Sequence, residues 1–166
     1  MTYYLKKSSF KRVENQLLED YQIIFEKTFN NNQANDLIQL NNEAKQEIQQ
    51  DISSLCFDSL VVDKQERDFL RFYAAVLYQQ NEPVGFAYSG YCPDINNREG
   101  RGCSLDVVYL ISKHRNRGIG ASFISIYLER VMEIFPDYVF FKAVTQDSNL
   151  PAQKLLEKLG FDTANE

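Results

Sequence analysis

The chain has 166 residues, of which 44% are hydrophobic and 25% charged, a balance typical of a single globular domain that can bury a core. Its net charge is −5, from 18 basic and 23 acidic side chains, which argues against a nucleic-acid partner. The excess of acid weakly favours a cationic small partner, and a mildly acidic surface that only confers solubility is the commoner explanation. No apolar run approaches the ~20 residues of a membrane span, and two lysines interrupt the start, so we expect a cytoplasmic protein with no signal peptide and no membrane partner.

The N-terminal part of the chain is predicted to form a strand followed by two helices. Thr2 to Leu5 is a short apolar, aromatic run typical of a strand. A surface helix capped by Ser8 or Ser9 is expected next, because apolar residues recur near helical spacing at Val13, Leu17, Tyr21, Ile24 and Phe29. A second helix is predicted from about Gln33 to Ser54. Residues 56–71 mix strand-like and charged runs and are not assigned.

The middle of the chain is rich in strand-forming residues. Phe72 to Leu77 and Val84 to Tyr88 are predicted to form a hairpin, with Pro83 confined to its turn. A loop from Cys92 to Gly102 then leads into a buried strand from Leu105 to Ile111.

The C-terminal part alternates helix and strand. Apolar periodicity predicts a helix from Ile119 to Ile134 that stops before Pro136. A strand is expected from Tyr138 to Val144, and a short helix is expected between the start signal at Asn149 and the helix-ending Gly160.

The turn between the 105–111 strand and the next helix has the composition of an anion site. It reads Arg115-Asn-Arg-Gly-Ile-Gly120. Glycines let backbone N–H groups approach a ligand closely, and a helix N-terminus adds a partial charge of roughly +0.5. Arg115 and Arg117 can add full charges beside it.

Two known phosphate-binding patterns do not fit this turn. A P-loop would end in Gly-Lys-Ser or Gly-Lys-Thr, and neither follows Gly120. A dinucleotide fold needs a third glycine where Phe123 stands and an acid ending the next strand, whereas Asp137 precedes that strand.

A third pattern, Arg/Gln-x-x-Gly-x-Gly/Ala, does fit, and here the turn resembles the acyl-CoA pyrophosphate loop of the GNAT superfamily of N-acetyltransferases. The run Asn149-Leu-Pro-Ala152 to Leu-Gly160-Phe161 resembles the family's second motif, in which an Asn and an Ala open a short helix that ends in Leu-Gly-Phe. About thirty residues separate the two motifs, which suits one helix and one strand. The resemblance extends from about Ala74 to Phe161.

The resemblance implies an α/β (α+β) fold with a mixed, mainly antiparallel twisted sheet flanked by helices. Residues 1–166 would form one domain, in which 1–71 supply N-terminal helices and the acceptor side and 72–161 form the cofactor-binding core. Only Asp162 to Glu166 follows Phe161, so the family's last two strands are expected to be missing. The Tyr138–Val144 strand should then lie at a sheet edge, covered by a second chain or by the N-terminal segment, and we prefer a homodimer.

The resemblance also implies how acetyl-CoA, the expected co-substrate, is held. Backbone N–H groups at the helix start would bind its pyrophosphate, the main chain of Val108 and Leu110 would pair with its pantetheine arm, and the Leu110 N–H would face the thioester carbonyl. The full set of residues assigned to the cofactor is Val108, Leu110, Arg115, Arg117, Gly118, Ile119, Gly120, Ala121 and Asn149.

Asp106 is the candidate catalytic base, with Leu110 as the catalytic backbone donor. Asp106 lies four positions before Leu110, on the same face of an apolar strand, and desolvation there would raise its pKa into a useful range. A hydrogen-bonded structural acid is an equally good interpretation, and a base acting through water would also serve.

The sequence departs from the family at the acid that protonates the leaving thiolate. Leu156 stands where many members carry a Tyr. The absence of this acid does not exclude acetyl transfer, because the thiolate of a thiol with a pKa of ~8.5 can leave without being protonated. Tyr109, Tyr127 and Ser148 are candidate substitutes.

The other reactive side chains are predicted to have structural or surface roles rather than catalytic ones. His114, in a polar turn, is expected to be an exposed loop residue, and Cys103 a small buried one. Arg98 and Arg101 are expected to be solvated loop charges, although they could reach the cofactor's phosphates. Three cysteines and one histidine without ligand spacing suggest reduced thiols and no metal.

We therefore expect an N-acetyltransferase that moves an acetyl group from acetyl-CoA to a primary amine by direct attack. The amine would belong to a small molecule or a peptide. The alternative is a catalytically weak or inactive acyl-CoA-binding regulatory module, favoured by Leu156 and the short C-terminus.

Overall fold

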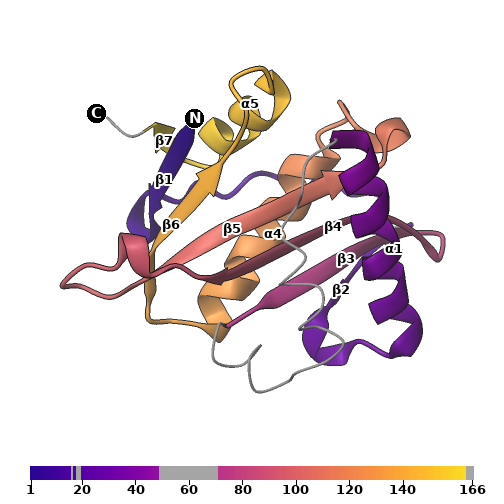
Figure 1. Cartoon of the computed structure of the whole chain (residues 1–166), viewed down its shortest axis with the longest axis horizontal. Coiled ribbons are helices and arrows are strands. Elements are labelled where there is room, and N and C mark those ends of the chain that lie inside the picture. Colours follow the sequence, from indigo (N-terminus) through magenta and orange to yellow (C-terminus); the bar gives the residue numbers. More distant parts are fainter. Residues whose placement is uncertain (16, 18–19, 49–70, 164–166) are drawn as a thin grey trace.

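A computed structural model describes residues 1–15, 17, 20–48 and 71–163, and it is built around one seven-stranded sheet (Figure 1). The strands lie in the order β2-β3-β4-β5-β6-β1-β7, and among these described strands β5 and β6 are the only parallel neighbours. They span β1 (Thr2–Lys6), β2 (Tyr21–Phe25), β3 (Tyr73–Gln79), β4 (Glu82–Tyr91), β5 (Arg101–Leu110), β6 (Tyr138–Val144) and β7 (Asp162–Thr163). The mixed, mainly antiparallel sheet confirms the predicted fold class.

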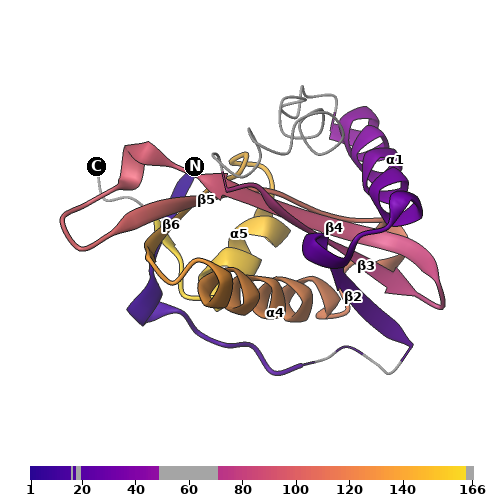
Figure 2. The same ribbon diagram turned by 90° about the horizontal axis from the view of Figure 1, so that it is seen from below.

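Helices cover both faces of this sheet. Figure 2 shows α1 (Asn31–Ile48) on one side, and α4 (Ile119–Ile134) and α5 (Leu150–Lys158) on the other. The core under α4 includes the fully buried Phe123, Tyr127 and Val131, and that under α1 includes Leu37 and Leu40. Burying each such side chain stabilises the fold by about 1.5–3 kcal/mol. None of the helices in the described ranges is both long and apolar enough to cross a membrane.

The first predicted helix is wrong, because the segment contains the edge strand β2. Tyr21 to Phe25 pairs antiparallel with β3, so that Ile23 lies opposite Leu77. Aromatic and β-branched residues suit a strand, and pairing with β3 overrides the approximate helical spacing. The second predicted helix is confirmed as α1, while its expected extension to Ser54 and residues 56–70 lie outside the described residues.

The prediction that the Tyr138–Val144 strand forms a sheet edge is also wrong. β1 lies antiparallel beside it, with Thr2 opposite Val144 and Lys6 opposite Phe140. The chain's own N-terminal segment therefore covers this side of β6, and the open edge that motivated the prediction of a homodimer is absent. Asp162 and Thr163, expected to form no strand, pair as β7 with the outer side of β1.

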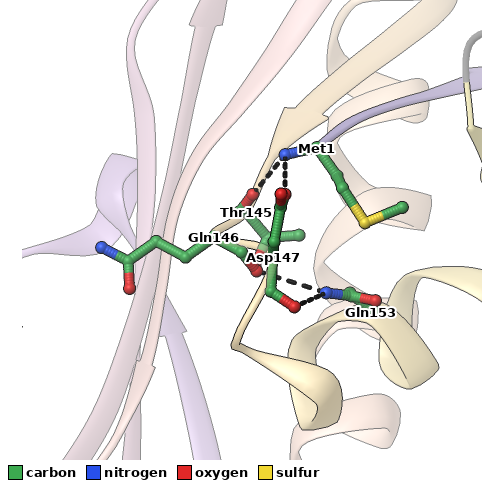
Figure 3. A network of polar contacts seen from close by, with 5 residues as sticks. All are labelled: Met1, Thr145, Gln146, Asp147 and Gln153. Carbon is green, nitrogen blue, oxygen red and sulfur yellow. Dashed lines mark hydrogen bonds and ion pairs between the residues drawn. The ribbon is translucent and has the colours of Figure 1, made fainter.

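The loop between β6 and α5 is held from two directions (Figure 3). The amino group of Met1 donates to the Thr145 carbonyl oxygen at 2.8 Å and contacts Asp147 Oδ1 at 3.0 Å. From α5, Gln153 Nε2 donates to the carbonyl oxygens of Gln146 at 3.2 Å and Asp147 at 2.9 Å. These bonds fix the approach to Asn149, where α5 begins.

Candidate functional site

The site is created where β5 parts from β6. The parallel pairing of the two strands ends at Leu105 opposite Ala143, whereas β5 stays paired with β4 as far as Leu110 opposite Gly85. In the described part of the chain, no strand pairs with the β6-facing side of residues 106–110. An open side of this kind leaves main-chain groups available to a ligand.

The pairing pattern shows which backbone groups face this gap. Ile111 N–H donates to the Val84 carbonyl oxygen at 2.9 Å, so Ile111 and Val84 form a hydrogen-bonded pair. Because such pairs alternate along an antiparallel ladder, the next is Tyr109 with Phe86. Val108 and Leu110 therefore direct their N–H and C=O groups away from β4 and into the gap.

A β-bulge at Asp106 changes the face on which this side chain lies. Tyr88 pairs with Val107 and Ser89 with Leu105, which leaves Asp106 as the extra residue. Leu105, Val108 and Leu110 pack toward α4, whereas Val107 and Tyr109 pack toward α1. Asp106 shares the α1 side with Ser104, whose hydroxyl donates to Asp106 Oδ1 at 2.6 Å. The prediction that Asp106 and Leu110 share a face is thus wrong, because the bulge reverses the alternation.

The surroundings of Asp106 make it a better proton acceptor than an ordinary aspartate. Its side chain remains accessible, yet partial desolvation raises its pKa to about 6. The hydrogen bond from Ser104 opposes this rise by stabilising the charged form. The carboxylate is therefore mostly ionised at pH 7 and can take up a proton near that pH.

The start of α4 has the features of an anion site. Gly118 is the N-cap in a left-handed conformation, with φ of 77°, and no side chain caps the helix. The N–H groups of the first turn thus lack the usual side-chain acceptor. A Cβ added to Gly120 would lie 3.3 Å from Leu110 Cδ1 and 3.4 Å from Leu155 Cδ1. The fold therefore places the glycine turn directly beside the end of β5, and this arrangement fits a phosphate attached to an extended arm.

The two arginines of the turn have different surroundings. Arg115 turns toward α1: its Nε donates to the Leu110 carbonyl oxygen at 2.8 Å and its Nη1 lies 2.6 Å from Glu47 Oε1. Arg117 is exposed, and within the described ranges it forms no ion pair. Sequence reasoning missed Glu47, and no local signal could have linked it to a turn far along the chain.

Tyr109 completes the contact with α1. Its hydroxyl donates to Glu47 Oε2 at 2.8 Å, and the Arg115 guanidinium lies 5.5 Å from its ring centroid. Burial, and then the bond to Glu47, raise the pKa of Tyr109 to about 12. The phenol therefore stays neutral and its proton is already engaged.

The other candidate thiolate acids differ in availability. Leu156 is buried in the core, and Tyr127 is fully buried with its hydroxyl 2.7 Å from both the Tyr73 carbonyl oxygen and Ser89 Oγ. Ser148 is exposed. Of these candidates, only Ser148 has an accessible hydroxyl.

Asn149 has a structural task at the start of α5. Its Oδ1 accepts a hydrogen bond from the Ala152 N–H at 3.2 Å, which caps the helix. This bond engages the side-chain oxygen, and the amide NH₂ group remains the part with which Asn149 could donate to a ligand.

The expectation of an exposed His114 is wrong. Only 2% of its surface is accessible, and its Nδ1 lies 2.7 Å from the Tyr21 hydroxyl. Burial, followed by the charges of Lys113 and Arg117, lowers its pKa. The ring packs edge-on against Tyr21 of β2, a segment whose apolar spacing predicts a helix.

Arg101 and Cys103 lie in the opposite half of β5 from the turn. Arg101 pairs with Asp137 at 3.6 Å and lies about 30 Å from Leu110 at the usual rise per strand residue. Neither Arg101 nor Arg98, three residues before it in the exposed loop, therefore lies near the glycine turn. Cys103 is fully buried, as predicted, and desolvation raises the pKa of its thiol. Over the described ranges, no three His, Cys, Asp or Glu side chains gather as metal ligands.

Comparisons with known proteins agree with this geometry. Residues 18–161 match the acetyltransferase (GNAT) family. A search of curated protein sequences gives no match. Among solved structures, a tandem GNAT protein from the clavulanic acid biosynthesis pathway has a TM-score of 0.66 at 14% identity, covering 97% of this chain and 49% of that one. The chain therefore spans about half the length of that protein.

Two other solved structures are similar over most of both chains. An aminoglycoside acetyltransferase from an uncultured soil metagenomic sample, in complex with trehalose, has a TM-score of 0.61 at 16% identity, covering 89% of this chain and 91% of that one. The ribosomal-protein-alanine N-acetyltransferase from Brucella melitensis has a TM-score of 0.62 at 16% identity, covering 88% and 94%. At these identities the likeness concerns the fold.

Proposed function

Because this chain belongs to the GNAT family of acetyltransferases, we propose that it transfers the acetyl group of acetyl-CoA directly to a primary amine. The observation that carries the proposal is the gap between β5 and β6, which ends at the uncapped start of α4. An open strand side followed by a helix N-terminus offers donors first to the amides of an extended arm and then to a pyrophosphate.

The proposed cofactor contacts come mainly from the main chain. Val108 and Leu110 would pair with the pantetheine arm, and Asn149 would approach the same arm from α5. The pyrophosphate would meet the first-turn N–H groups, with the Arg117 side chain beside them; the turn residues are Arg117, Gly118, Ile119, Gly120 and Ala121. Acetyl-CoA supplies the activated acetyl group, and this chain supplies orientation and charge stabilisation.

The proposed chemistry uses two groups of β5. The Leu110 N–H would stabilise the oxyanion that forms on the thioester carbonyl, and one such donor is worth roughly 3 kcal/mol of barrier. Asp106 would accept the proton of the attacking amine, directly or through water, for which its pKa of about 6 is suitable. Because the bulge turns Asp106 to the α1 side, the amine would approach from that side of the sheet.

The leaving thiolate is proposed to depart as its anion. Leu156 cannot donate a proton, and the hydroxyls of Tyr109 and Tyr127 are held by other partners. The same observation favours the second candidate function, an acyl-CoA-binding regulatory module with weak or no turnover. A free thiol pKa of ~8.5 makes unassisted departure feasible, and we therefore keep transfer as the first proposal.

The acceptor is proposed to be an amine on a small molecule or a peptide. The names of the similar structures include an aminoglycoside acetyltransferase and a ribosomal-protein-alanine N-acetyltransferase, which exemplify both classes. The net charge of −5 suits a cationic acceptor. Buried, unpaired Cys92 and Cys103 suit the reducing cytoplasm that we propose as the protein's location.

Calorimetric titration with CoA, combined with a thiol-release assay on acetyl-CoA, tests the proposal. The amine panel would contain an aminoglycoside, a polyamine and a peptide with an N-terminal alanine. CoA binding with amine-dependent thiol release is the expected result. Binding without thiol release would favour the regulatory module, and no CoA binding would contradict both candidates.

A further inference from the structure

The two arginines of the glycine turn are two residues apart, yet their side chains are held differently. Arg115 reaches the Leu110 carbonyl oxygen, the Glu47 carboxylate and the Tyr109 ring at once. A guanidinium carries its donors in a fixed planar fork, so this set of contacts holds its orientation more firmly than one contact would. The Arg115 side chain is committed to α1 and to the end of β5.

Glu47 is equally committed. Its two carboxylate oxygens receive the Arg115 guanidinium and the Tyr109 hydroxyl, at 2.6 Å and 2.8 Å. The hydrogen bond from Arg115 is the main reason that the pKa of Glu47 is lowered. The ion pair thus stays charged across the pH range in which an acetyltransferase works, although both side chains are partly exposed and the pair is screened by solvent.

The position of Glu47 connects this pair to the acceptor side. Glu47 follows Ala44 by one helical turn, and Ala44 is buried against the sheet, so both lie on the face of α1 that meets β5. The contact therefore fastens the C-terminal part of α1 to the strand end. It also fixes the Leu110 carbonyl, next to the N–H that we assign to the oxyanion.

Arg117 has none of these restraints. It is exposed, it lies one residue before the N-cap Gly118, and within the described ranges no carboxylate pairs with it. A free guanidinium beside an uncapped helix start is well suited to meet a phosphate.

We propose, on the premise of the function proposed above, that Arg115 and Glu47 are a positioning pair for acetyl transfer. They set the Leu110 backbone and the end of α1 against each other, while Arg117 supplies the side-chain charge that binds the pyrophosphate. The two arginines of one short motif thus have separate roles, one in the geometry of the reaction and one in cofactor affinity.

The test compares glutamine variants that remove each charge while keeping a polar side chain. CoA affinity is measured by titration calorimetry for Arg117→Gln, Arg115→Gln and Glu47→Gln, with Arg98→Gln in the exposed loop before β5 as the matched control. We expect Arg117→Gln to weaken CoA binding by about tenfold and the other variants to change it by less than about threefold. Equal losses in Arg115→Gln and Arg117→Gln would overturn the division of roles.

Kinetics with the fastest amine of the panel separates positioning from simple stability. Arg115→Gln and Glu47→Gln should each lower kcat about tenfold with little change in the KM for acetyl-CoA, and the double variant should lose no more than either one. Arg115→Lys keeps the charge but not the fork, so it should restore only part of kcat. Additive losses, or an unchanged kcat in folded single variants, would contradict the positioning pair. A wild type that binds no CoA would instead refute the proposed function itself.

Discussion

The two halves of β5 differ in their neighbours. Arg101 to Leu105 has β4 on one side and β6 on the other, whereas among the described strands Asp106 to Leu110 pairs with β4 only. In the first half the main chain is hydrogen-bonded to strands on both sides, and Cys103 is fully buried. In the second half Val108 and the Leu110 N–H face away from β4, while the Leu110 carbonyl oxygen accepts a hydrogen bond from Arg115 Nε. The difference teaches that this site is made by an interrupted ladder more than by reactive side chains.

The largest loss of CoA affinity is expected from substitutions that block the end of the Asp106–Leu110 half of β5, where it meets the glycine turn. Gly120→Asp adds a Cβ within 3.3 Å of Leu110 Cδ1 and a negative charge at the helix start. CoA affinity should fall by roughly 100-fold or more, because both the space and the partial positive charge are lost. Gly118→Asp should act likewise, since its φ of 77° also disfavours a side chain. Calorimetry on the folded variants is the measurement, and unchanged affinity would end the proposal for this turn.

A smaller effect, on turnover, is expected from changing the side chain at the bulge. Asp106→Asn removes the proposed proton acceptor but leaves the open backbone intact, so turnover should fall by about tenfold or more while CoA affinity stays within about threefold. Initial rates of thiol release and calorimetry measure the two quantities. A variant as active as the wild type, or one that merely unfolds, would support the structural interpretation of Asp106.

The pH dependence of kcat/KM also tests whether Asp106 is the base. The base must be ionised to act, and its raised pKa is about 6, so kcat/KM should reach a plateau above about pH 7, be half-maximal near pH 6 and approach a tenfold fall per pH unit below that. The acidic limb should vanish in Asp106→Asn. A limb that persists in this variant would assign the titration to another group.

The smallest loss of CoA affinity is expected from a change beneath the Arg101–Leu105 half of β5, which is paired with a strand on each side. Tyr127→Phe deletes the hydroxyl that lies 2.7 Å from the Tyr73 carbonyl oxygen and from Ser89 Oγ, opposite Leu105. Stability should drop by about 1–3 kcal/mol, because buried polar groups lose their partner. CoA affinity should not change. Denaturant unfolding and calorimetry would check both, and a large loss of affinity would mean that the two halves are coupled.

Local patterns predicted the elements nearest the site. The glycines and the apolar period after them identify the turn and α4, and runs of strand-forming residues bounded by polar or turn residues identify β3 to β6. These features depend on residues close together in the sequence, which is why periodicity detects them.

Features set by distant neighbours could not be predicted in this way. The bulge at Asp106 depends on how β4 pairs with β5, and a single extra residue moves a side chain to the opposite face. The Arg115–Glu47 contact joins α1 to a turn that follows three strands later in the chain, after β3, β4 and β5. His114 was misjudged because its partner, Tyr21, lies in a strand whose sequence resembles a helix.

The placement of β1 has a consequence for the order in which the sheet can be completed. Met1 and Thr145 are hydrogen-bonded across 144 positions of sequence, and β1 has β6 and β7 as its sheet neighbours. The entropy of closing so long a loop must be overcome before this pairing stabilises anything, which makes it a late folding event. During synthesis the first strand leaves the ribosome long before β6 exists. We therefore expect a nascent chain shorter than about 140 residues to keep its N-terminal strand undocked and sensitive to proteases, and docking to coincide with the appearance of β6.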